Sequence, residues 1–144
     1  MIKIRTANHQ ELKSVFRLLR KVNLPLEGVA DHFDNFFIAQ EEDQLVGCIG
    51  IELYENVGLI RSVAVDPSFQ GRGIGNILVD AIQKFGKEKK LKAIYLLTET
   101  AADFFSKLDY MIIPRDKADD RIKKSIEFTS ACPASATCMM KILT

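Results

Sequence analysis

The chain of 144 residues has no tryptophan, only four prolines, an odd number of cysteines and no long apolar run. Three cysteines do not suit a disulfide framework, so Cys48, Cys132 and Cys138 predict a reduced, cytoplasmic protein. No apolar run approaches the ~18 residues that a membrane helix needs, and the opening MIKIRTANHQ contains no apolar signal core. The net charge is only +1. We therefore expect neither nucleic acid nor a membrane as a partner.

What the chain does contain is the ordinary composition of a folded protein, with 47% hydrophobic and 27% charged residues. Its length is close to that of a usual single domain, which can bury a core without staples. The sequence has no internal repeat and no linker-like stretch. We predict one α+β domain that covers residues 1–144.

The first half predicts a helix and an antiparallel meander. IKIRTA alternates apolar and polar residues, which favours a short strand. Asn8 is a candidate N-cap with Glu11 as its capping-box partner, and apolar residues at helical spacing predict a helix over about 9–22. The segments NFFIAQE, LVGCIGIELYE and VGLIRSVAV are strand candidates joined by short turns.

The second half predicts a crossover helix and three more strands. The helix over 73–87 rests on an apolar stripe of Ile74, Ile77, Leu78, Ala81, Ile82 and Phe85. LKAIYLLT, YMIIP and ATCMMKIL are strand candidates, and AADFFSKL is a short helix. A strand–helix–strand unit of this length implies a right-handed crossover, with parallel pairing between the strands that end near 65 and 98.

A cluster of glycines, QGRGIG at 70–75, lies between the strand that ends at Val65 and the crossover helix. A helix N-terminus has unpaired N–H groups and partial positive charge, and glycine lets a phosphate come close to them. The spacing fits neither G-x-x-x-x-G-K-[ST] nor G-x-G-x-x-G. By itself such a cluster is an ordinary turn or packing device about as often as it is an anion-binding site.

In its setting the cluster resembles the acetyl-CoA motif of the GNAT superfamily of N-acetyltransferases. Gln70, Gly73 and Gly75 match Q-x-x-G-x-G after a V-A-V-x-P strand end, and TETAADFFSKLDY is similar to the family's N-x-x-A-x-x-F-Y-x-x-x-G-F. The resemblance implies an α+β fold with a mostly antiparallel sheet of six to seven strands, a central parallel pair and about four helices. It also implies an acetyl-CoA-dependent N-acetyltransferase that needs no metal.

The resemblance further implies which residues hold acetyl-CoA as co-substrate. The pantetheine arm would pair with the backbone of Val63, Ala64 and Val65. The pyrophosphate would lie on the motif residues, which are Gln70, Gly71, Arg72, Gly73, Ile74, Gly75 and Asn76. Thr98 stands where the family often has Asn, and Phe104 would lie along the cofactor. Arg72 and Lys107 would reach outer phosphates, unless they are simply solvated.

The family's usual catalytic side chains are missing. Leu59 stands where many members have Glu, and Phe105 stands where many have the Tyr that protonates the thiolate. An alkyl amine is protonated at pH 7, so a base or a water path must remove one proton. Glu52 is the first candidate base, because it is a lone acid in the apolar strand CIGIELY and burial would raise its pKa. The alternative is a solvent-facing residue near a strand end.

The acceptor side is less defined by the sequence. Arg61, inside GLIRSVAV, would bind a substrate carboxylate or pair with Glu52 across neighbouring strands. His32 and Glu27 lie in the loop region that lines the acceptor site in this family, so His32 is a candidate substrate-binding residue. Tyr110 is a distant candidate acid, with a core position as the alternative.

The segment SIEFTSACPASATCMM resembles a GNAT branch recorded in arsenic-resistance gene clusters, and more distantly the amino-acid N-acetyltransferases. This implies a small amino-acid-like acceptor and leaves a homodimer open. Cys132 and Cys138 would be small buried hydrophobes or, alternatively, a thiol pair for a soft metal or metalloid. Because the family's usual Glu and Tyr are missing at Leu59 and Phe105, an alternative function stays open, namely a non-catalytic acyl-CoA-binding or thiol- or metalloid-sensing module.

Overall fold

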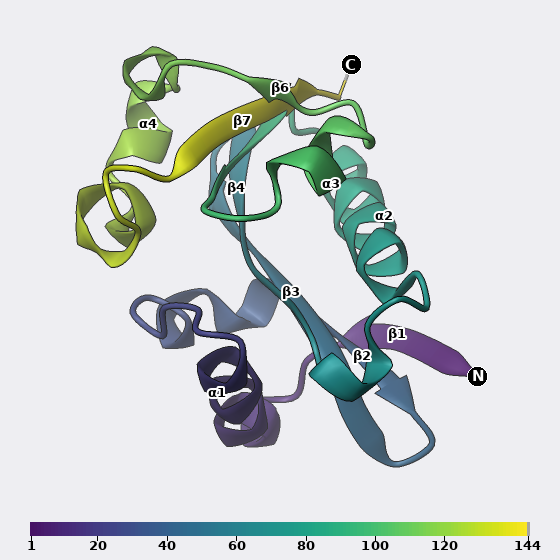
Figure 1. Ribbon diagram of the computed structural model, residues 1–144. Coiled ribbons are helices and arrows are strands. Elements are labelled where there is room, and N and C mark those ends of the chain that lie inside the picture. Colours follow the sequence, from purple (N-terminus) through teal and green to yellow (C-terminus); the bar gives the residue numbers. More distant parts are fainter. Residues whose placement is uncertain (144) are drawn as a thin grey trace.

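The computed structural model describes residues 1–143, which form a mixed seven-stranded sheet (Figure 1). In spatial order the strands are β1 (Ile2–Thr6), β2 (Phe36–Glu41), β3 (Gln44–Tyr54), β4 (Val57–Val65), β5 (Ala93–Thr98), β7 (Thr137–Ile142) and β6 (Met111–Ile112). The pairing is antiparallel except between β4 and β5. The predicted fold class, with its one parallel pair, is confirmed.

The helices are α1 (Leu12–Lys21), α2 (Ile74–Glu88), α3 (Ala102–Ser106) and α4 (Asp120–Lys123). Short 3-10 turns cover His9–Glu11, Ala30–Asn35, Pro67–Phe69 and Arg115–Lys117, and a π-helical turn covers Glu127–Ala131. The predicted capping box is present, since the Asn8 side chain accepts from Gln10 N at 2.9 Å and Glu11 Oε1 accepts from Asn8 N at 2.8 Å. It satisfies N–H groups that would otherwise be unpaired where the helical segment begins.

Helices cover both faces of the sheet (Figure 1). The apolar stripe of α2 packs on one face, where Leu78 and Ile82 join a large core with Ile49 and Ile94. On the other face α1 covers a second cluster around Phe36 and Ile38, and Ile122 of α4 covers a third around Leu59 and Tyr95. The face of the sheet that α1 and α4 cover therefore has two separate apolar clusters. The buried polar side chains of Glu52 and Arg61 belong to neither cluster.

The strands β4 and β5 separate part-way along their length. Their parallel pairing runs from Val57 with Ala93 to Ile60 with Leu96, whereas β4 continues beside β3 to Val65. A register shift between Cys48 and Gly50 coincides with Ser62, whose φ of 59° is in the left-handed region. An irregularity of this kind bends the strand and increases its twist. A cleft opens where the two strands part.

In the part of the chain that the structure describes, no helix combines the length and apolar character that crossing a membrane requires.

Candidate active site

One cavity, of about 500 Å³, lies over the glycine cluster and the start of α2. It is lined by Val63, Val65, Phe69, Gln70, Gly71, Gly73, Ile74, Gly75, Asn76, Ala101 and Phe104. Most of the residues that the resemblance assigned to the cofactor therefore lie on one wall. We call this space the donor cavity.

The glycines leave the mouth of α2 open. Gly71 and Gly73 have φ of 83° and 79°, and a Cβ at either position would meet no atom within 4 Å. Gly73 is the N-cap of α2 and has no side chain to satisfy the first N–H groups of the helix. These free donors and the helix dipole make the wall suitable for an anion such as pyrophosphate.

Two polar side chains hold the loop before α2 in place. Gln70 Nε2 donates to the carbonyl oxygen of Val65 at 3.1 Å, which ties the loop back to the end of β4. Asp66 accepts from Ser68 N at 2.9 Å and from Lys21 Nζ at 3.0 Å. The Ser68 backbone bond, followed by the lysine, lowers the pKa of Asp66. The motif glutamine thus shapes the cavity wall.

Four residues that were expected to bind the cofactor do not line the donor cavity. Ala64 is buried in the sheet, where it pairs with Cys48. Arg72 lies 4.8 Å from the Phe69 ring centroid, and its Nη1 is 3.6 Å from Glu41 Oε2. Lys107 is exposed at the end of α3. Thr98 Oγ1 accepts from Ala101 N at 2.9 Å and lines the adjoining cavity.

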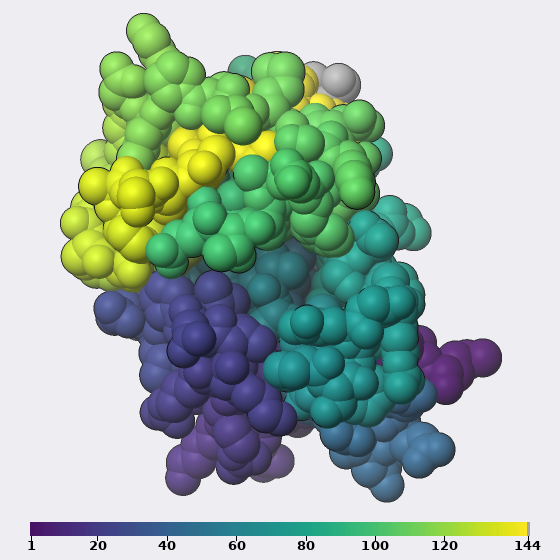
Figure 2. Space-filling view, viewed as in Figure 1, coloured from purple at the N-terminus to yellow at the C-terminus, as the bar shows by residue number. Residues whose placement is uncertain are grey.

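This second cavity, of about 350 Å³, occupies the gap between the separating ends of β4 and β5. Val63, Ala101 and Phe104 line both cavities, so the two spaces are contiguous. In Figure 2 the hollow lies between the dark blue segment after α1, the green segment after β5 and the teal start of α2. Its polar lining includes Asn23, Arg61, Ser62, Glu99, Glu127 and Cys132. We call it the acceptor cavity.

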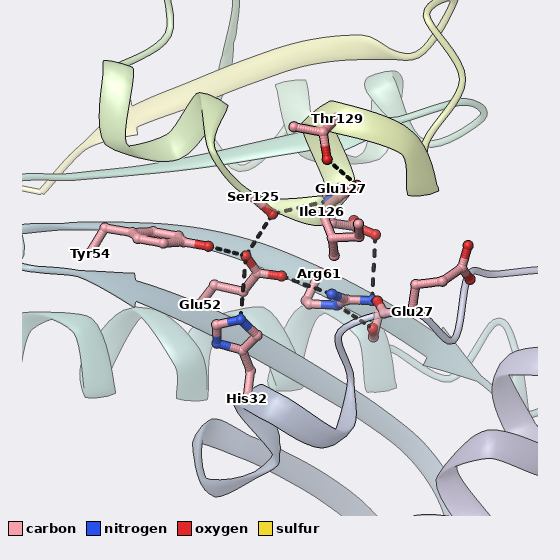
Figure 3. Close-up of polar contacts among 10 residues, drawn as sticks. Glu27, His32, Glu52, Tyr54, Arg61, Ser125, Ile126, Glu127 and Thr129 are labelled. Carbon is pink, nitrogen blue, oxygen red and sulfur yellow. Dashed lines mark hydrogen bonds and ion pairs between the residues drawn. The ribbon is translucent and has the colours of Figure 1, made fainter.

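A buried ion pair lies under the acceptor cavity (Figure 3). Arg61 Nη1 donates to Glu52 Oε2 at 2.8 Å, and both side chains are 0% exposed. The other carboxylate oxygen of Glu52 accepts from Tyr54 Oη at 2.5 Å and from Ser125 Oγ at 2.6 Å. The pairing of Arg61 with Glu52 across neighbouring strands is confirmed. The hydrogen bond from Ser125 joins this pair to the segment after α4.

The expected rise in the pKa of Glu52 is not found. Burial does raise this pKa, but the hydrogen bonds from Ser125, Tyr54 and Arg61 and the nearby His32 outweigh it, so the net pKa lies below the usual range. A carboxylate that is ionised, buried and already accepting from three side chains is poorly suited to take a proton from a substrate. Its geometry is that of a positioning residue for Arg61.

Arg61 lines the acceptor cavity, and its fully buried guanidinium is held from several sides. Nη2 donates to the carbonyl oxygen of Glu27 at 2.6 Å, and Nε donates to Ser62 Oγ at 3.1 Å. Nη2 also lies 3.5 Å from Glu127 Oε2, the longest of the Arg61 contacts. Glu27, expected near the acceptor site, thus contributes its backbone carbonyl there.

His32 lies on the other side of Glu52 from Ser125 (Figure 3). Its Nε2 is 3.7 Å from Glu52 Oε1, and its ring centroid is 6.4 Å from that of Tyr54. Burial, followed by Glu52, raises the pKa of Tyr54 to about 12. His32 was predicted to bind substrate, yet the structure groups it with Glu52 and Tyr54 and not with the lining of the acceptor cavity.

The sequence interpretation missed Ser125 and Glu127. Glu127 is 4% exposed and lines the acceptor cavity. Burial raises its pKa, and the nearby Arg61 only partly opposes this. The signal was available, because Glu127 is a lone acid between apolar residues in SIEF, just as Glu52 is in CIGIELY.

The residues at the family's usual catalytic positions are core residues. Leu59 and Phe105 are 0% and 4% exposed. Tyr110 packs against Phe105 and donates to Gln83 Oε1 at 2.9 Å, which confirms its core position.

The three cysteines are free. Burial and then the Glu127 carboxylate raise the pKa of Cys132 to about 12, and burial also raises the pKa of Cys138. Both thiols are therefore less acidic than a free cysteine, whereas thiol exchange proceeds through the thiolate. Within residues 1–143, His, Cys, Asp and Glu side chains form no group of three or more that could hold a metal ion.

Comparison with known proteins identifies the family. The sequence model of the acetyltransferase (GNAT) family matches residues 5–110. The chain belongs to this family. It is therefore an acetyltransferase, and the glycine cluster that lines the donor cavity lies within the residues that match the family.

Individual relatives are distant. An uncharacterized N-acetyltransferase of Chlorobaculum tepidum is 28% identical over 114 residues, or 78% of this chain and 71% of that protein. An amino-acid acetyltransferase of Mycobacterium tuberculosis is 36% identical over 77 residues, or 50% of this chain and 43% of that protein. The chain thus spans less than half the length of this second relative.

Solved structures share the fold. Rv2747 of Mycobacterium tuberculosis, in complex with CoA and a second ligand, superposes with a TM-score of 0.83 at 21% identity over 99% of both chains. N-acetylglutamate synthase of Neisseria gonorrhoeae, complexed with coenzyme A and N-acetyl-glutamate, gives 0.85 at 18% identity, over 100% of this chain and 35% of that one.

Proposed function

We propose that this acetyltransferase transfers the acetyl group of acetyl-CoA to the amino group of a small amino-acid-like acceptor by direct attack on the thioester. The observation that carries the proposal is the contiguity of the two cavities, with Arg61, whose guanidinium is buried, among the residues that line the second. Some relatives of the chain are amino-acid acetyltransferases, and one neighbour in fold was crystallised with N-acetyl-glutamate. These names support the acceptor class.

The donor would lie along the wall that the family motif builds. The α2 N-terminus and the glycines hold the pyrophosphate, and the pantetheine arm follows β4 where β5 has left it. The acetyl group would then reach the region of Val63, which borders both cavities. A strand N–H near Val63 stabilises the thioester oxygen, and holding the two reactants together supplies much of the rate.

The acceptor would bind through its carboxylate to Arg61. A guanidinium suits a carboxylate because it offers parallel donors in a planar fork. Since the shorter hydrogen bonds to Glu52 and the Glu27 carbonyl fix the orientation of Arg61, the longer contact with Glu127 is the one that a substrate would replace. An amino acid brings both a carboxylate for Arg61 and an amino group for the thioester.

Three further expectations from the sequence stay predictions. They are the relationship to proteins of arsenic-resistance gene clusters, the cytoplasmic location and a homodimer. The non-catalytic module loses support, because the chain belongs to a family of acetyltransferases.

Release of CoA thiol tests the proposed acceptor class. The purified protein and acetyl-CoA are mixed with L-alanine, L-glutamate, L-methionine and L-phenylalanine, and each is compared with the matching amine that lacks the α-carboxylate. We expect release with at least one amino acid and a rate at least about tenfold lower with its amine, which is the loss of one charge-assisted contact. Equal rates for the two members of every pair, or no release at all, would contradict the proposal.

A further inference from the structure

We propose that Glu127 binds the ammonium group of the acceptor and removes the proton that must leave before the amine attacks. This inference rests on the proposed function and names the missing base. It assigns the role that Glu52 was expected to fill to a second carboxylate, which contacts the other terminal nitrogen of Arg61.

The geometry distinguishes the two carboxylates. Glu52 is 0% exposed, and it accepts from Tyr54, Ser125 and Arg61. Glu127 lines the acceptor cavity together with Arg61, and its only ion pair is the 3.5 Å contact with Nη2 of that residue, among the residues that the structure describes. Glu127 therefore faces the space where an acceptor would sit and has capacity to accept another hydrogen bond.

The local charge also favours a cation at this place. Arg61 carries one positive charge and Glu52 one negative charge, so their contact is neutral as a pair. An ionised Glu127 then leaves one negative charge beside the cavity. A zwitterionic amino acid matches this arrangement, because its carboxylate can contact Arg61 while its ammonium group contacts Glu127.

The groups that face Glu127 poise it for proton transfer. Burial raises its pKa, Arg61 and the Cys132 thiol lower it, and Glu52 and Glu27 raise it. Arg115 lies beyond, near Cys132. A general base works best when its pKa lies near the working pH, and a raised carboxyl pKa moves in that direction. Cys132 is protonated and so can donate to Glu127 but cannot compete with it for the proton.

The proton balance closes without another reactant. The acceptor ammonium gives one proton to the Glu127 carboxylate, and the free amine attacks the thioester carbon, so that a C–N bond forms. The C–S bond then breaks as the second proton of the nitrogen passes to the thiolate of CoA. The products are the N-acetyl amino acid and CoA thiol, and Glu127 returns its proton to solvent.

The test is Glu127→Gln, which keeps the shape of the side chain and removes its basicity. With the amino acid that the wild-type protein acetylates fastest in the panel above, we expect kcat to fall by about 10²-fold or more. We expect the affinity for acetyl-CoA to stay within about twofold. The acid limb of the wild-type profile of kcat/KM against pH should disappear in the variant. A variant that keeps both the wild-type kcat and the acid limb overturns the inference.

Two comparisons separate the remaining outcomes. Glu99→Gln changes an exposed acid of the same cavity. Loss of the acid limb in this variant, with its retention in Glu127→Gln, would assign the base to Glu99 instead.

Difference infrared spectra of the wild type against Glu127→Gln should show a carboxyl group that titrates above the ordinary range of glutamate. The absence of this signal contradicts the inference even where Glu127→Gln folds poorly. If the wild type acetylates nothing in the panel, the proposed function fails first, and this inference fails with it.

Discussion

At the scale of single residues, the buried pair of Glu52 and Arg61 is the feature on which the acceptor side depends. The charge of Glu52 is offset by three donors, one of which, Ser125, is 73 positions away in the sequence. A buried charge is tolerated only when its partners satisfy it. The pair fixes the guanidinium that we assign to the acceptor carboxylate.

Glu52→Gln should destabilise the fold by about 3–5 kcal/mol at neutral pH, because it leaves Arg61 without its main counter-charge. The pKa of Glu52 is lower in the folded protein than in the unfolded chain. Its stabilisation is therefore present at pH values above the ordinary glutamate pKa, and it is lost as the pH falls through the lower folded value. The difference between variant and wild type should shrink toward acid pH, as measured by urea unfolding between pH 3 and 8.

The control is Glu88→Gln, a change of an exposed acid at the end of α2, which should alter stability by no more than about 0.5 kcal/mol. A Glu52→Gln difference that stays constant from pH 3 to 8 would mean that the ionised carboxylate is not the stabilising species.

The sequence predicted that Glu52 and Arg61 are unusual, and it offered their pairing as one alternative. It did not predict the direction of the Glu52 pKa, because that direction depends on Ser125 and Tyr54 as well as on burial. Tyr54 is two residues away on the same strand, but Ser125 reaches Glu52 only through the packing of the segment after α4. A sequence pattern does not reveal a contact between two residues so far apart in the chain.

At the scale of elements, the start of α2 was the most predictable part of the molecule. The apolar stripe over 73–87 and the glycines before it predicted the helix that the structure places at Ile74–Glu88. The parallel strand pair was predicted from the crossover, since a strand–helix–strand unit allows little else. The point at which β4 and β5 part was only implied by the resemblance, because it depends on the local pairing near Ser62.

Gly73→Val should abolish measurable binding of acetyl-CoA in isothermal titration. A β-branched side chain at φ of 79° is strained, and it would extend into open space at the mouth of α2, where we place the pyrophosphate. The cooperative unfolding transition should remain.

The matched control for this variant is Lys90→Val. Lys90 also has a positive φ, 61°, but it lies past the other end of α2. The control adds a β-branched side chain in the same region of φ, with a smaller loss of stability because Lys90 already has a Cβ there, and it should bind acetyl-CoA with nearly unchanged affinity. If Gly73→Val binds as tightly as Lys90→Val, the glycine cluster is only a turn.

At the scale of the whole molecule, the sheet brings the proposed donor and acceptor cavities side by side. The strands β4 and β5 are paired at one end and separate at the other, and the two contiguous cavities occupy the opening. One wall comes from the start of α2 and the other from the segments after α1 and α4. The donor cavity is lined largely by one continuous motif, whereas the acceptor cavity is lined by segments from both halves of the chain. A local sequence motif therefore indicates the donor side better than the acceptor side.

The central claim is that acetyl groups pass across this opening onto an amino acid. Mass spectrometry of the reaction with acetyl-CoA and the amino-acid panel tests it most directly. We predict an N-acetyl amino acid in amounts equal to the CoA thiol released, and none with Gly73→Val. Thiol release without any acetylated amino acid, or binding of acetyl-CoA without either product, would contradict the account.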